Sequence, residues 1–183
     1  MNKRERISQW LAEVGSETGD GPPSGRPEAR SGGAPAPADV EKHPYYLAFF
    51  RCWNEQQYYD AHDFLEQLWL NTKSPDADFF KGLIQAAGAF VHLQKRFDHP
   101  SHAKHSRRLS PAVRLFRLAG KNLANFGPRH HALDVAALCQ LLSRYADEIV
   151  ASDYTINPWS PETAPKLQLG KAVKPNAAPR PLE

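Results

Sequence analysis

Residues 75–97 have apolar side chains around most of the circumference of a helix. In the stretch PDADFFKGLIQAAGAFVHLQKRF, Phe, Leu, Ile, Val or Ala falls on nearly every side of a helical wheel. A helix that is apolar nearly all round needs other elements around it, so it belongs at the centre of a bundle. Gly82 and Gly88 have no side chains, and we expect neighbouring helices to approach closely there. One narrow polar line remains: Lys81, Gln85, Gly88, His92 and Lys95.

Four further segments have the apolar spacing of helices and predict the partners of this central helix. They are residues 44–53, residues 58–69 after a turn at 54–57, residues 110–126 and residues 131–151. Ser74 is the expected N-cap of the central helix, with Pro75 as its first residue. The sequence has no alternating strand pattern and no internal repeat. It therefore predicts an all-α fold, a five-helix bundle formed by residues 42–151.

The segments on either side of the bundle bury little. Residues 1–14 predict an additional short amphipathic helix, because four apolar residues have helical spacing: Ile7, Trp10, Leu11 and Val14. We favour a helix that docks weakly on the bundle or frays; the alternative is a helix that binds a protein partner, with Trp10 as the anchor. The C-terminal tail is a second possible segment for binding a protein partner. Residues 15–41 are rich in Gly and Pro, and residues 152–183 are Pro-rich and basic, so we expect a disordered linker and a disordered tail. Trp159 is expected to hold the first few tail residues against the bundle.

Bulk composition argues against several classes of protein. A formal net charge of +3 is too small to indicate nucleic-acid binding. No stretch approaches the ~20 apolar residues needed to cross a bilayer, and the N-terminus has no apolar run of the signal-peptide kind. The two cysteines, Cys52 and Cys139, both fall within helical patterns, which predicts reduced thiols. We therefore expect a soluble cytoplasmic protein that does not contact membranes.

The candidate site lies in residues 53–69. On a helix, His62 and Glu66 are one turn apart at the edge of the apolar face, and Asp63 lies further round. The short connection to the central helix predicts antiparallel neighbours, which places Gln85 near His62. His92 falls further along, toward Asn54 and Tyr58. The candidate ligand-binding residues are Asn54, Tyr58, His62, Asp63, Glu66, Trp69, Gln85 and His92.

Three interpretations of this cluster remain open. The favoured one is a structural or partner-binding module, in which a buried hydrogen-bond network determines which helices pair. The second is a site for a small molecule or a divalent metal ion, with His62, Glu66 and His92 as ligands. The third is a small enzyme in which His62 is the general base and Glu66 holds its tautomer. The sequence offers no obvious nucleophile, requires no cofactor and does not reveal a substrate.

Residues 95–108 form a basic, histidine-rich connection. Its histidines are His99, His102 and His105, and its cations are Lys95, Arg96, Lys104, Arg107 and Arg108. The alternatives are a phosphate or RNA contact, adventitious metal capture, or a solvated loop. We favour the loop, because no aromatic residues alternate with the cations to stack on bases. His130 and His131, at the start of the last helix, are expected to be neutral caps or exposed residues.

Two segments, WNEQQYYDAHDFLEQLW and FFKGLIQAAGAFVHLQK, resemble the signature segments of the domain-of-unknown-function 309 family. The matching positions are Trp53, Asn54, Ala61, His62, Asp63, Glu66, Trp69, Gly82, Leu83, Ile84, Gln85 and His92, followed by Leu133, Asp134 and Val135. The resemblance covers about residues 45–150 and implies a small all-helical domain with a polar cluster, but no activity. This chain departs from the pattern where Asp63 replaces a Glu and where Gln56 replaces a frequent Gly. Its histidine-rich connection is also longer than usual.

Overall fold

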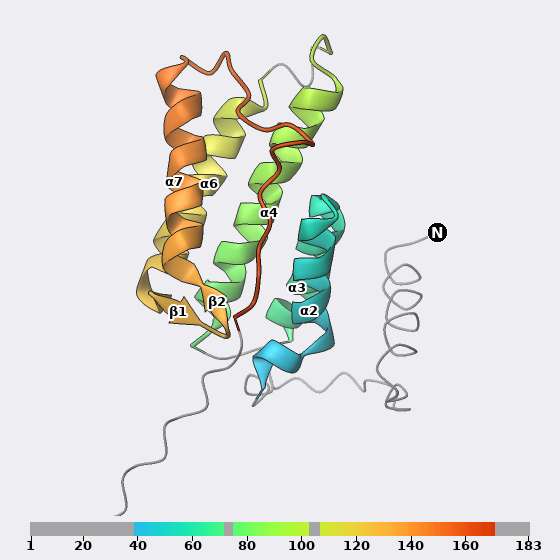
Figure 1. Ribbon diagram of the computed structural model, residues 1–183, viewed down its shortest axis with the longest axis vertical. Helices are drawn as coiled ribbons and strands as arrows, with labels where there is room; N and C mark the ends of the chain where they lie inside the picture. The colour runs from blue at the N-terminus through green and yellow to red at the C-terminus, as the bar shows by residue number, and fades with distance from the viewer. Residues whose placement is uncertain (1–38, 72–74, 103–106, 171–183) are drawn as a thin grey trace, which may run out of the picture.

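The structure is a computed structural model that describes residues 39–71, 75–102 and 107–170. Over these ranges the chain forms five α-helices that pack side by side, with a small hairpin before the last one (Figure 1). The predicted five-helix bundle is confirmed. No helix within these ranges is long and apolar enough to cross a membrane. The predicted N-terminal helix, most of the predicted linker, Ser74 and residues 171–183 lie outside the described residues.

The bundle begins with the helical pair α2 (Pro44–Asn54) and α3 (Tyr58–Leu70). His43 caps α2, because its Nδ1 accepts a hydrogen bond from the backbone N–H of Tyr45, and Pro44 is the first residue. In the turn between the helices Gln56 has a φ of 62°, a left-handed conformation that glycine adopts without strain. This explains why a glycine suits that position. The predicted linker is wrong at its end, where Val40–Lys42 form a 3-10 turn and Val40 is buried.

Helix α4 (Ala77–Asp98) lies at the centre of the bundle, as its apolar pattern predicts. It lies between the α2–α3 pair and the pair formed by α6 (Leu109–Leu123) and α7 (Val135–Ala151) (Figure 1). A Cβ atom at Gly82 would be 2.7 Å from Leu123 Cγ on α6, so the close approach predicted at Gly82 is confirmed. The fit at Gly88 is looser, with Leu115 Cδ1 at 3.4 Å from a Cβ atom.

A two-stranded antiparallel hairpin separates α6 from α7, after a 3-10 turn at Ala124–Phe126. Its strands are β1 (Arg129–His130) and β2 (Leu133–Asp134). The prediction of a last helix from residue 131, with no β structure, is therefore wrong at this point. The physical reason is that His131 and Ala132 have positive φ values of 43° and 62°, which form a tight hairpin turn. Asp134 then caps α7 by accepting a hydrogen bond from the backbone N–H of Ala137.

The C-terminal segment, residues 152–170, returns along the bundle to the hairpin (Figure 1). Trp159 is buried, as expected, but the contact continues well beyond it. The Trp53 indole donates to the carbonyl of Pro165, and the Asn54 side chain both donates to and accepts from the backbone of Leu167 at 2.8 Å. Over these residues the predicted disorder is wrong, because side chains of α2 supply hydrogen bonds that a strand partner would otherwise provide.

Candidate functional site

His62, Asp63 and Glu66 meet on one edge of α3, and we call this group the α3 cluster. His62 Nδ1 is 3.3 Å from Asp63 Oδ1, and one ligand atom from each residue lies within 4.8 Å of the others. Within the described residues Asp63, at 6% exposed, is the only buried polar or charged one. A carboxylate removed from water needs a partner. A His62 tautomer with its proton on Nδ1 provides one when no ion is bound, whereas the tautomer with its proton on Nε2 presents a lone pair on Nδ1 to an ion shared with Asp63.

The structure differs from the prediction in the partners of His62. Asp63 contacts its ring, although the helical wheel placed Asp63 further round. Gln85 was expected near His62, but its Oε1 accepts a hydrogen bond of 2.8 Å from Asn122 on α6. The reason is that α6 packs along α4 as α3 does, so it competes for the polar line on α4. His62 does reach this line at Gly88, where its Cδ2 would be 4.0 Å from a Cβ atom.

His92 also has a partner outside the α3 cluster. Its Nδ1 accepts a hydrogen bond of 3.1 Å from the guanidinium of Arg108. Burial lowers the pKa of His92, and the nearby positive charge of Arg108 lowers it further. The imidazole is therefore held neutral, with one nitrogen occupied. Arg108, which the sequence grouped with a solvated connection, turns toward the bundle instead.

Two other candidate residues hold the C-terminal segment. Asn54 is bonded to the backbone of Leu167, as described above, and the hydroxyl of Tyr58 accepts a hydrogen bond of 3.2 Å from the Trp159 indole. Tyr58 is fully buried, and this burial raises the pKa of its hydroxyl to about 12. Trp69 packs against the margin of the core. These contacts give Asn54 and Tyr58 a structural role in the fold.

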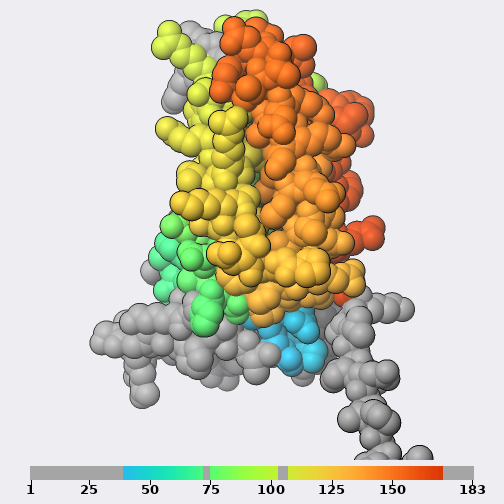
Figure 2. All heavy atoms as spheres, turned by 90° about the vertical axis from the view of Figure 1, so that its left-hand side faces the viewer, coloured from blue at the N-terminus to red at the C-terminus, as the bar shows by residue number. Residues whose placement is uncertain are grey.

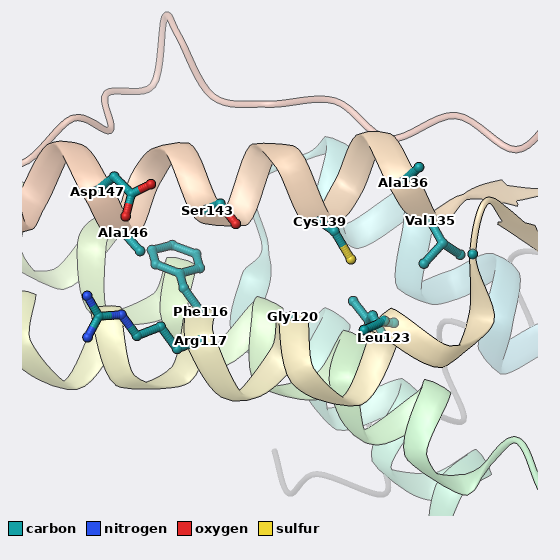
Figure 3. A pocket seen from close by; sticks show the side chains of 12 residues that line it. Phe116, Arg117, Gly120, Leu123, Val135, Ala136, Cys139, Ser143, Ala146 and Asp147 are labelled. Carbon is teal, nitrogen blue, oxygen red and sulfur yellow. The ribbon is translucent and has the colours of Figure 1, made fainter.

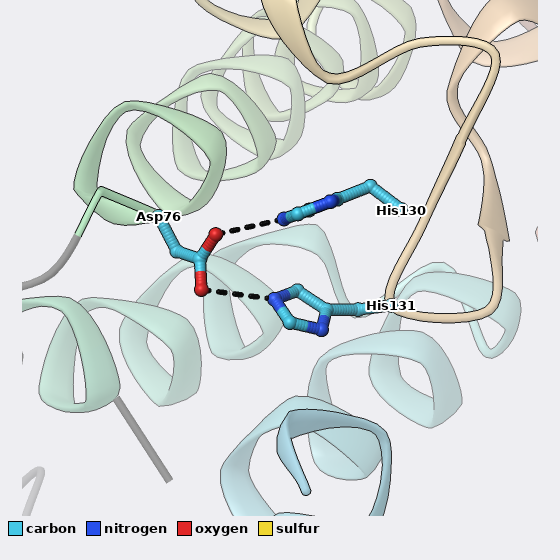
Figure 4. A group of neighbouring side chains, drawn as sticks. All are labelled: Asp76, His130 and His131. Atoms are coloured by element: carbon cyan, nitrogen blue, oxygen red, sulfur yellow. Dashed lines mark hydrogen bonds and ion pairs between the residues drawn. The ribbon is translucent and has the colours of Figure 1, made fainter. Parts of the chain in front are cut away.

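A second group of polar side chains, which we call the hairpin cluster, consists of Asp76, His130 and His131 (Figure 4). The two oxygens of Asp76 are 2.8 Å from His130 Nε2 and 3.0 Å from His131 Nε2. Burial is the largest single influence on the pKa of Asp76 and acts to raise it. The hydrogen bonds and the charges of the two imidazoles together outweigh burial and hold that pKa below its usual value of 3.8.

The sequence analysis did not bring the hairpin cluster together. It did not connect Asp76 with the two histidines, and it expected His130 and His131 to be neutral caps or exposed residues. The only local signal is the His-His pair just ahead of the cap of the last helix. Asp76 is 54 and 55 residues away from its two partners, and no periodicity connects them.

Comparison with known proteins identifies the first half of the bundle. Residues 46–102 match the family model described as domain of unknown function (DUF309). The chain contains a DUF309 domain. The resemblance noted in the sequence is thereby confirmed over residues 46–102, which include the α3 cluster and Asp76. His130 and His131 lie beyond the matched residues. No curated protein and no solved structure matches the chain.

The two cysteines of the bundle are held as thiols. Burial raises the pKa of Cys52, on α2 of the DUF309 domain, to about 12, and it also raises that of Cys139 on α7. A protonated thiol is a weak nucleophile and a weak metal ligand. The two cysteines are therefore weaker candidates for nucleophilic or metal-binding roles than the imidazole and carboxylate groups. His99 and His102 of the connection are exposed, and Lys104 and His105 lie outside the described residues.

Proposed function

We propose that the DUF309 domain binds a divalent transition-metal ion through the α3 cluster. The observation that supports this proposal is the convergence of three ligand atoms within 4.8 Å, contributed by His62, Asp63 and Glu66. Ligand atoms about 2.0–2.2 Å from an ion lie about 3 Å from one another. The 3.3 Å separation between His62 Nδ1 and Asp63 Oδ1 is close to that spacing.

The ligand types indicate which ions the α3 cluster would favour. One imidazole and two carboxylates carry two negative charges when His62 is neutral, and a divalent cation balances them. Oxygen-rich sets of this kind suit Mn²⁺ and Fe²⁺ as well as Zn²⁺. His62 is about one-third exposed, so the site opens to solvent on one side. Three protein ligands leave a coordination position for water or a small anionic ligand.

Isothermal titration calorimetry on the chelator-stripped full chain tests this function. Mn²⁺, Fe²⁺ under anaerobic conditions and Zn²⁺ are each titrated into the parent and into His62→Gln. We expect loss of a direct ligand to weaken binding at least about tenfold. His99→Gln, which changes an exposed histidine of the connection, is the matched control and keeps the parent affinity. The proposal is contradicted if calorimetry detects no binding of any of the three ions, or if His62→Gln binds them with the same affinity as the parent.

A groove between α6 and α7 supports a second candidate function, the docking of an amphipathic segment of this chain. The two helices lie side by side on one face of the molecule (Figure 2). The groove between them has a volume of about 490 Å³ and is lined by Phe116, Arg117, Gly120, Cys139, Ser143 and Asp147, among others (Figure 3). Its apolar floor and polar rim suit an apolar anchor side chain. We propose the amphipathic residues 1–14, with Trp10, as the segment that it accepts.

The groove is tested with a fluorescently labelled peptide of residues 1–14 and the chain that begins at residue 39. No atom lies within 4 Å of a Cβ atom built at Gly120, so Gly120→Trp fills the groove without a clash at that atom. We expect fluorescence anisotropy to show binding to the parent and its loss in Gly120→Trp. Leu118→Trp, at an exposed position of α6, is the control that retains binding. Absence of binding to the parent removes this candidate.

A further inference from the structure

The hairpin cluster lies at the end of the bundle where α4 begins (Figures 1 and 4), whereas His62 faces Gly88 in the middle of α4. Asp76 immediately precedes α4, His130 is the last residue of β1, and His131 is in the hairpin turn. We propose that Asp76, His130 and His131 are the ligands of a second divalent metal ion, of the zinc type. The proposal does not depend on metal binding by the α3 cluster.

The distances in the hairpin cluster are close to those of a coordinated ion. Two imidazole nitrogens and one carboxylate form a ligand set that proteins use for Zn²⁺ with a fourth, open position. Ligand atoms about 2.0–2.1 Å from a tetrahedral ion are about 3.3 Å apart. The N–O separations of 2.8 and 3.0 Å, each to a different oxygen of Asp76, are a few tenths of an ångström shorter than this. One ligand atom from each of the three residues lies within 4.8 Å of the others, so small side-chain movements would bring all three onto one ion.

The backbone of the hairpin directs both imidazoles to one carboxylate. Successive residues of a strand point to opposite faces, so adjacent histidines do not ordinarily share a partner. They do so here because His131 and Ala132 have φ values of 43° and 62°. For residues other than glycine, this conformation is unfavourable, and it is concentrated at functional sites. The strained turn places His131 against Asp76, on the same side as His130.

A further carboxylate faces the other ring nitrogen of His131. Glu41 Oε2 is 3.8 Å from His131 Nδ1. A neutral imidazole has a single N–H, so a neutral His131 cannot donate to Asp76 and Glu41 at once. With an ion on Nε2, the N–H lies on Nδ1 and points to Glu41, the usual arrangement for a histidine that binds metal. The ion also compensates the two negative charges of Asp76 and Glu41.

Aromatic and backbone contacts hold the imidazoles in place. The ring of Phe79 meets that of His130 edge to face, with centroids 4.7 Å apart, and Phe126 lies 4.9 Å away. The hydroxyl of Tyr46 donates a hydrogen bond of 3.0 Å to the carbonyl of His131. The side chains of His130 and His131 are 28% and 19% exposed, so an ion can enter from solvent. A preorganised ligand set with an entry path is what a metal site requires.

The test is a zinc titration of the full chain, prepared without a polyhistidine tag and stripped with chelator. Calorimetry measures the number and affinity of Zn²⁺ ions, and the visible absorption of Co²⁺ reports tetrahedral coordination. His130→Gln and His131→Gln remove one ligand each, and His62→Gln is the matched control because it changes only the α3 cluster. We expect His62→Gln to keep one zinc-binding event that both hairpin variants lose or weaken at least about tenfold.

A fourth variant separates loss of the metal from loss of the fold. Glu41→Gln leaves all three ligands in place, and we expect it to weaken zinc binding about 10–100-fold, as removal of a histidine's outer partner typically does. Circular dichroism melts identify any hairpin variant that is unfolded, in which case the affinity of Glu41→Gln decides. If Glu41→Gln and the folded hairpin variants bind zinc as tightly as the parent, the proposal is overturned. The proposal is also overturned if the parent chain binds a single Zn²⁺ ion and His62→Gln no longer binds it.

Discussion

The α3 cluster and the hairpin cluster contain the same kinds of side chain but are assembled differently. The α3 cluster takes its three residues from little more than one turn of a single helix. The hairpin cluster joins the start of α4 to a turn 54 residues further along the chain. The α3 cluster has two carboxylates and one imidazole, whereas the hairpin cluster has two imidazoles and one carboxylate. The first exists wherever α3 is helical, whereas the second exists only in the assembled bundle.

This difference has a physical consequence for how each cluster relates to stability. Contacts within one helical turn close a very short loop and are only weakly coupled to the rest of the fold. Contacts between distant segments form only when the bundle closes, so their full strength contributes to the free energy of unfolding. Any ion that binds the native cluster but not the unfolded chain adds to this effect by mass action.

The largest expected contrast comes from removing the central carboxylate of each cluster. We expect Asp76→Ala to lower the free energy of unfolding by about 2–3 kcal/mol, because two imidazoles lose a charged acceptor. Asp63→Ala is expected to cost about 1 kcal/mol or less, since removing a buried charge also removes its desolvation penalty. Urea unfolding of the metal-free chain, followed by circular dichroism, measures both. A loss in Asp63→Ala equal to that in Asp76→Ala would break the comparison.

A smaller effect is expected of Asp76 on the stability of the fold at acidic pH. The pKa of Asp76 is below its usual value of 3.8 in the folded chain, so the unfolded chain binds its proton first on acidification. Asp76 therefore stabilises the fold fully above that usual value, and its contribution disappears as pH falls through the lower, folded pKa. Unfolding free energies measured by urea titration across this range should decline less steeply in Asp76→Asn than in the parent. An unchanged slope would mean that the two imidazoles do not hold the carboxylate ionised.

The smallest effect is expected from His92, which belongs to neither cluster. Burial first, and then Arg108, lowers its pKa from the usual 6.5, so the unfolded chain takes up a proton that the folded chain excludes. Stability should therefore fall as pH decreases from about 6.5 toward the folded pKa. We expect His92→Gln to flatten this part of the stability profile slightly. We also expect this variant to leave the metal affinity of both clusters unchanged. A lower affinity measured by calorimetry would mean that His92 is a metal ligand together with the α3 cluster.

The parts of the fold that could be predicted are those determined by neighbours in the sequence. The apolar circumference of α4 predicts its central place, and the i, i+4 spacing of His62 and Glu66 predicts that they share an edge. Gln56 stands where the resemblance implies a frequent glycine, and its φ of 62° shows why a glycine suits that position. In each case the information lies within a few residues of the position concerned.

The parts that could not be predicted depend on partners far along the chain. Nothing near Asn54 indicates that its side chain would bond to the backbone of Leu167, 113 residues away. The turn at His131 and Ala132 lacks the Asn-Gly or Asp-Gly pair that usually marks a hairpin. Gln85 was assigned to His62 because only one neighbour of α4 was considered, whereas Asn122 of α6 bonds to it.

The last described residue of the C-terminal segment links that segment to the hairpin. The backbone N–H of Gly170 donates to the carbonyl of Ala132, so this residue is tied to the hairpin turn beside His131. A movement of this turn would therefore also disturb the end of a segment that is bonded to α2 through Asn54.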